Sequence, residues 1–134
     1  MSRMPLIVAN WKMYKSVKEA KNFINSLIPL ITSSKRRIFI APSYPAIPAS
    51  VEAAGNSSIM IGSQNIHDQI EGAFTGEVSA KMIKECGAQF CIIGHSERRE
   101  YFQESNLLIN RKLKRALKEK LIPILCVGET LHER

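Results

Sequence analysis

The sequence predicts an α/β fold in which parallel strands alternate with helices. Three observations support this prediction. Short apolar runs alternate along the chain with longer segments of helical periodicity. The strand-like runs, such as IFIA at 38–41 and CIIG at 91–94, are apolar at consecutive positions, as in strands covered on both faces. No low-complexity linker divides the 134 residues, so we expect one domain over 1–134.

The first two elements have clear local signals. Leu6–Asn10 is a short apolar run and is expected to be a strand. The first helix is expected to begin at Ser16, because Ser16 and Glu19 have the spacing of a capping box. Pro29 is expected to strain or end this helix, since proline cannot donate a helical hydrogen bond.

The remaining elements continue the alternation. Strands are expected at 37–41, 58–62, 90–94 and 121–127, and helices at 45–54, 79–86 and about 105–119. Gly55 and Gly87 follow the second and third helices, where a glycine at the C′ position often ends a helix. The order is strand and helix in turn from the first strand to the fifth. Length alone favours an open sheet, because a closed barrel of eight strands and eight helices needs at least ~200 residues.

Composition excludes several classes of protein. With 45% hydrophobic and 23% charged residues, the chain is an ordinary globular sequence, and no apolar run is long enough to span a membrane. The three cysteines have neither zinc-site nor disulfide spacing, so we expect reduced thiols and a cytoplasmic protein with no metal. The net charge is +7, most of it from residues 111–120. We expect these cations on the outer face of a helix, in solvent, with no nucleic-acid partner, because no aromatic residues interleave with them.

Polar residues that could carry chemistry follow the first and fourth strands. Asn10 and Lys12 are expected to point the same way at the end of the first strand, where an amide and a cation could hold an anionic ligand. His95 follows the fourth strand and precedes a segment that could turn into a helix. A helix N-terminus favours the neutral imidazole, which can donate a hydrogen bond to a carbonyl oxygen.

The connection over 63–78 is unusually long for an α/β fold. It carries apolar side chains and a tip between two glycines, with Phe74 near the tip. We expect this loop to dock into a partner chain; the alternative is a lid over the protein's own site.

Four motifs in order resemble triosephosphate isomerase: VANWKM at 8–13, GAFTGE at 72–77, GHSERR at 94–99 and CVGET at 126–130. The resemblance implies the first five strands and four helices of a (β/α)₈ barrel, incomplete in this chain. It also implies interconversion of dihydroxyacetone phosphate and D-glyceraldehyde 3-phosphate through an enediolate, without a cofactor, in glycolysis and gluconeogenesis. This family is itself a standard example of a histidine held neutral by a helix N-terminus.

The resemblance also implies roles for single residues. Catalytic roles fall to His95, Lys12 and Glu97, and substrate binding to Asn10 and Lys12. His95 resembles the group that polarises the carbonyl, and Lys12 the cation that faces the phosphate and the developing oxyanion. Supporting roles fall to Ser96, Cys126 and Glu129, the last of which resembles a residue that holds a mobile loop open. A homodimer is implied through Phe74, Thr75, Glu77 and Arg98, with Glu77 paired to Arg98 across the two-fold axis.

The resemblance covers only the first half of the family's chain. The family's catalytic glutamate, its mobile loop and its glycine-rich phosphate site correspond to no residue here. We therefore expect an N-terminal portion of an isomerase that is inactive as a 134-residue polypeptide. Two alternatives are an inactive half-barrel module that dimerises and binds anions, and a weak nucleic-acid binder that uses residues 111–120.

Overall fold

The structure is a computed structural model that describes residues 4–31 and 36–134. Its centre is a parallel sheet of five strands. In chain order these are β1 (Leu6–Asn10), β2 (Arg37–Ala41), β3 (Ile59–Ser63), β4 (Phe90–Ile93) and β5 (Ile122–Leu125), and they lie side by side in the same order. A doubly wound sheet reverses its strand order at a switch point, whereas a barrel winds in one direction. The strand order is therefore that of a barrel, and the open sheet favoured by length is wrong.

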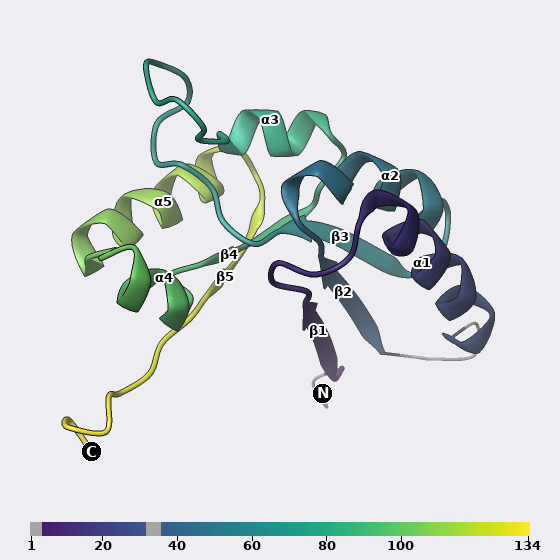
Figure 1. The fold of residues 1–134 in the computed structure, drawn as a ribbon, viewed down its shortest axis with the longest axis horizontal. Helices are drawn as coiled ribbons and strands as arrows, with labels where there is room; N and C mark the ends of the chain where they lie inside the picture. Colours follow the sequence, from purple (N-terminus) through teal and green to yellow (C-terminus); the bar gives the residue numbers. More distant parts are fainter. Residues whose placement is uncertain (1–3, 32–35) are drawn as a thin grey trace.

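Helices gather on one side of this sheet, as Figure 1 shows. They are α1 (Val17–Ile31), α2 (Ile47–Ala54), α3 (Ala80–Glu85), α4 (Ser96–Tyr101) and α5 (Asn106–Lys118), with a 3₁₀ turn at Tyr44–Ala46. The larger hydrophobic core joins the strands to the helices and includes Ile24, Ile40 and Ile61. A smaller core lies on the opposite face of the strands, where the rings of Phe39 and Phe90 stack with centroids 4.7 Å apart.

Local signals set most of the element boundaries. The capping box is confirmed: the Ser16 backbone N–H donates to Glu19 Oε2 at 2.7 Å, and the Glu19 N–H donates to Ser16 Oγ at 3.4 Å. Gly87 has φ +87 directly after the C-cap of α3, as expected of a glycine that ends a helix. Pro29 does not end α1, which continues to Ile31, because the buried face of the helix keeps it packed on the core.

One further expectation is corrected by the fold. α4 is a short helix in addition to the four that the sequence predicted. Ile93 packs in the core between the strands and the helices and is fully buried there. Val8 lies opposite Phe39 in the register of β1 and β2, on the other face. None of the helices formed by the described residues is long and apolar enough to cross a membrane.

The two outer strands expose apolar side chains. Leu6 and Ile7 of β1 are 45% and 47% exposed, and Ile122 of β5 is 40% exposed. Strand edges with apolar side chains favour pairing with other chains. We therefore expect the 134-residue polypeptide to associate in solution, which sedimentation velocity over a range of concentrations would measure. A compact monomer with a sharp melting transition would contradict this expectation.

Candidate active site

The segment after β1 holds Asn10 and Lys12 in a fixed geometry. Lys12 has φ +51, a left-handed conformation that is uncommon for a residue other than glycine. Two side chains hold this backbone: Asn10 Oδ1 accepts from the Lys12 N–H at 3.0 Å, and Gln64 Nε2 donates to the Lys12 carbonyl at 2.8 Å. Gln64 Nε2 also donates to the carbonyl of Ala41 at 2.9 Å. The first three strands thus fix the position from which the Lys12 side chain extends.

The segment after β4 places His95 at the N-cap of α4. Gly94 has φ +70, so the chain turns sharply between the end of the strand and the histidine. The imidazole Nδ1 accepts the backbone N–H of Glu97 at 3.2 Å. A nitrogen that accepts a hydrogen bond carries no proton, so the neutral ring has its proton on Nε2. This geometry leaves Nε2 as the nitrogen from which the ring can donate to a ligand.

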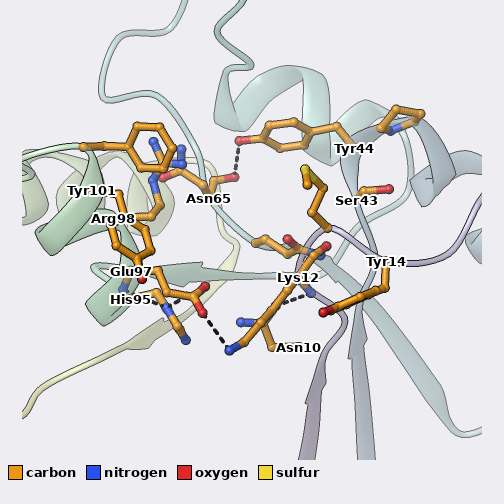
Figure 2. A pocket seen from close by; sticks show the side chains of 14 residues that line it. Asn10, Lys12, Tyr14, Ser43, Tyr44, Asn65, His95, Glu97, Arg98 and Tyr101 are labelled. Carbon is orange, nitrogen blue, oxygen red and sulfur yellow. Dashed lines mark hydrogen bonds and ion pairs between the residues drawn. The ribbon is translucent and has the colours of Figure 1, made fainter.

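The two segments meet through an ion pair. Lys12 Nζ lies 2.7 Å from Glu97 Oε1, although the two residues are 85 positions apart. The hydrogen bond to Glu97 and the charge of its carboxylate raise the pKa of the Lys12 ammonium. The same hydrogen bond lowers the pKa of Glu97, against a smaller opposing effect of desolvation. Both groups are therefore charged at neutral pH, and Figure 2 shows them pointing toward each other.

A cleft of about 610 Å³ contains these groups. Its lining comes from the segments that follow the first four strands: Asn10, Lys12, Met13, Tyr14, Ser43, Tyr44, Pro45, Gln64, Asn65, His95, Glu97, Arg98, Tyr101 and Phe102. An amide, an ammonium, a carboxylate and an imidazole thus share one concave surface at the carboxyl ends of the strands. This arrangement suits a small anion that carries a carbonyl group, because it combines a cation with a neutral hydrogen-bond donor.

The three residues predicted to support the site lie outside the cleft. Ser96 is exposed in the first turn of α4 and does not line the cleft. Cys126 is half-buried beyond β5, its carbonyl accepts from Arg99 Nη2 at 3.1 Å, and burial raises the pKa of its thiol. Glu129 is exposed and lies 3.6 Å from Arg134. The structure does not bring Ser96, Cys126 and Glu129 into the cleft itself.

The residues predicted to form a dimer interface lie in two places. Phe74, Thr75 and Glu77 are exposed in the loop between β3 and α3, which extends away from the sheet in Figure 1. The Phe74 ring packs on His67 of the same loop, with centroids 4.3 Å apart. Arg98 lines the cleft, and its Nε donates to Glu104 Oε1 at 2.7 Å within the chain.

The lining residues that the sequence did not predict include Tyr44, Gln64 and Asn65. Gln64 holds Lys12, as described above, and the Tyr44 hydroxyl donates to the carbonyl of Asn65 at 2.9 Å. Burial raises the pKa of Tyr44 well above its ordinary value. Gln64 and Asn65 could have been predicted as site residues from the sequence. This polar pair directly follows the third strand, at the same edge of the sheet as Asn10 and His95.

The expectation that the cations of α5 all lie on its outer face is wrong for Lys112. Its side chain is only 4% exposed, and Nζ donates to Glu104 Oε1 and, at 2.8 Å, to Asn65 Oδ1. Burying a lysine is costly unless it is paired, and this one is paired with a buried carboxylate. The network joins α5 to Asn65 and Arg98 of the cleft. Lys112 therefore helps to hold Asn65 and Arg98, two residues that line the cleft, through this buried network.

Among residues 4–31 and 36–134 no group of three or more histidine, cysteine or acidic side chains is placed to hold a metal ion.

Comparison with known proteins gives one consistent result. The family model of triosephosphate isomerase matches residues 5–134. The triosephosphate isomerase of Protochlamydia amoebophila is 50% identical over 98% of this chain, and that of Clostridium botulinum is 46% identical over the same share. The matched regions are 50% and 53% of those two proteins, so the chain spans about half the length of these relatives.

The fold agrees with a solved structure. The crystal structure of triosephosphate isomerase from Bartonella henselae superposes with a TM-score of 0.92 at 36% identity, over 98% of this chain and 54% of that one. The five sequential parallel strands and their helices thus match the first part of a (β/α)₈ barrel, as the sequence motifs implied. On the family match, the sequence identity and the shared fold, this chain belongs to the triosephosphate isomerase family.

Proposed function

We propose that this chain supplies the N-terminal half of an isomerase active site that interconverts dihydroxyacetone phosphate and D-glyceraldehyde 3-phosphate in glycolysis and gluconeogenesis. The observation that carries the proposal is the Lys12–Glu97 ion pair beside His95 in one cleft. Shifting a proton between carbons next to a carbonyl passes through an enediolate, whose negative oxygen needs a donor and a cation. The cleft contains both.

Each polar group has a distinct proposed role. His95, with its ring proton on Nε2, donates to the carbonyl oxygen. It then transfers protons from one oxygen of the enediolate to the other. Lys12 faces the phosphate and the developing oxyanion, and Glu97 orients its ammonium. Asn10 holds the Lys12 backbone through Oδ1, which leaves its amide nitrogen for the substrate. This set of roles needs no cofactor.

We further propose that residues 1–134, as a separate polypeptide of one partial barrel domain, have no measurable isomerase activity. The family's catalytic glutamate, mobile loop and glycine-rich phosphate site belong to the half of the relatives that this chain does not match. Without a base, the carbon next to a polarised carbonyl does not lose its proton at a useful rate. A coupled assay in both directions measures this. Turnover clearly above buffer that is abolished by His95→Gln would contradict the proposal.

Binding tests the retained half-site independently of turnover. Phosphoglycolate, a mimic of the enediolate, should shift the imidazole resonances of His95 in an NMR titration. Lys12→Met should abolish most of this response, because the variant removes the cation that faces the phosphate. Lys21→Met is the matched control: it breaks an exposed lysine–glutamate pair on another part of the molecule, Lys21 with Glu52 at 2.9 Å. Equal responses in the two variants would contradict the proposed role of Lys12.

A homodimer formed through loop 63–78 is also proposed, in the cytoplasm. Support comes from exposed apolar side chains at two sites. Phe74 in the loop is 44% exposed, and Met13, Tyr14 and Phe102 at the edge of the cleft are 94%, 73% and 64% exposed. Clusters of exposed apolar side chains are typical of protein–protein contacts. Thr75 of the docked loop would then approach the partner's site, and Glu77 would pair with Arg98 across the axis.

A further inference from the structure

A second, smaller cleft lies between α5 and the loop that follows β3. Its volume is about 210 Å³, and its lining is Asp68, Gln69, Arg111, Lys114, Arg115 and Lys118. It shares no lining residue with the larger cleft. Four of its six residues are cations on one face of α5, and a function for this cleft does not follow from the isomerase site.

The two arginines of this cleft are fixed by the loop. Arg111 Nε donates to Asp68 Oδ2 at 2.8 Å, and Arg115 Nε donates to the carbonyl of Asp68 at 3.1 Å. The loop thus holds both side chains through their Nε atoms. A guanidinium has five N–H donors, so Arg111 keeps its terminal nitrogens for another acceptor. Fixing the side chain beforehand reduces the entropy that is lost when a ligand binds.

The two lysines supply charge that the protein does not neutralise. Lys114 and Lys118 are exposed and have no anionic partner among the residues that the structure describes. Asp68 and Glu119 offset the two arginines, since Arg115 Nη1 lies 3.6 Å from Glu119. The cleft therefore has an excess of two positive charges. Like charges four positions apart destabilise a helix slightly, and an anion bound between Lys114 and Lys118 would relieve this repulsion.

We propose that this cleft binds a small dianionic phosphate group, as inorganic phosphate or the larger pyrophosphate. Guanidinium and ammonium groups are the usual partners of phosphate oxygens. The volume lies below the ~300 Å³ at which pockets for drug-sized ligands begin, so a small anion fits the cleft better than a larger ligand does. No aromatic ring lines the cleft, so it offers no surface on which a nucleic-acid base could stack. This proposal does not rest on the proposed isomerase function.

Titration of the 134-residue chain with inorganic phosphate, pyrophosphate and a twelve-residue oligothymidylate tests the proposal, with the side-chain Nε–H resonances of Arg111 and Arg115 as the readout. Both small anions should shift these resonances, and added salt should weaken the binding. The double variant Lys114→Gln/Lys118→Gln should bind pyrophosphate at least tenfold more weakly. The double variant Lys18→Gln/Lys81→Gln makes the same change in net charge at exposed lysines elsewhere and should bind as the parent does.

Two results would overturn the proposal. One is equal loss of pyrophosphate binding in both double variants, because the effect would then come from net charge and not from the cleft. The other is tighter binding of the oligonucleotide than of pyrophosphate, with a salt dependence that corresponds to several phosphates, which would indicate a nucleic-acid surface. The response of His95 to phosphoglycolate, read in the same spectra, should not change in Lys114→Gln/Lys118→Gln. The two sites are therefore tested separately.

Discussion

Replacing His95 with glutamine should lower kcat about 10²–10³-fold in a chimera that continues residues 1–134 with the second half of the Bartonella henselae isomerase. The complete barrel is needed because, on the proposal above, the base lies in that second half. We propose His95 as the donor of the cleft, because its Nδ1 accepts the Glu97 N–H and leaves Nε2 to donate. Removal of one donor to a developing oxyanion typically has an effect of this size. Steady-state kinetics in both directions would measure it.

The matched control for this prediction is His132→Gln, which changes an exposed histidine outside the cleft. It should leave kcat within a factor of two of the parent chimera. A decrease in kcat of less than tenfold for His95→Gln would show that the imidazole does not stabilise the transition state. A rise in KM with unchanged kcat would assign His95 to ground-state binding instead.

Replacing Lys112 with methionine should lower the free energy of unfolding by about 3–5 kcal/mol, the usual consequence of removing one partner of a buried ion pair. The side chains of Lys112 and Glu104 are 4% and 3% exposed, and Glu104 Oε2 has no hydrogen-bond partner. In the variant, the carboxylate would remain buried, with Arg98 as its only cation among the residues that the structure describes. Urea denaturation followed by circular dichroism would measure the loss.

A double variant distinguishes the lost pair from a packing defect. In Lys112→Met/Glu104→Leu both charges are removed, and most of the lost stability should return. If the double variant is as unstable as Lys112→Met, then the cause is packing rather than the unpaired charge.

The pH dependence of stability follows from the same network. Burial by itself raises the pKa of Glu104, but the hydrogen bonds from Lys112 and Arg98 outweigh it, so the pKa lies below its ordinary value. A carboxylate with a lowered pKa stabilises the fold above the ordinary value of about 4.3. This stabilisation is lost as the pH falls through the lowered pKa. The stability difference between the parent and Glu104→Gln should therefore shrink on acidification below about pH 4.

Much of the fold could be predicted because its signals are local. Alternating apolar segments, the Ser16 capping box and the glycines after α2 and α3 act over a few residues, so they can be read without knowing the rest of the molecule. The same is true of the polar residues that follow β1 and β4. In a parallel sheet these strand ends lie at one edge, so their order in the sequence already brought Asn10, Lys12 and His95 together as candidates.

The direction and burial of individual side chains could not be predicted, because they depend on contacts between distant segments of the chain. Periodicity placed Lys112 with the other cations of α5, yet it is buried, since Asn65 and Glu104 reach it from other parts of the chain. Likewise, neither the φ +51 of Lys12 nor the amide of Gln64 that holds it follows from the residues around position 12.

The sequence by itself determined the strands, most of the helices, the family motifs and the set of polar residues at the strand ends. Only the tertiary structure decided that Lys112 is buried against Glu104 and that Asp68 fixes two arginines of α5. The physical reason is the separation along the chain between the residues that interact. Backbone conformation and caps are set by neighbours in the chain, whereas an ion pair across 85 residues forms only when the winding of the sheet brings its partners within hydrogen-bond distance.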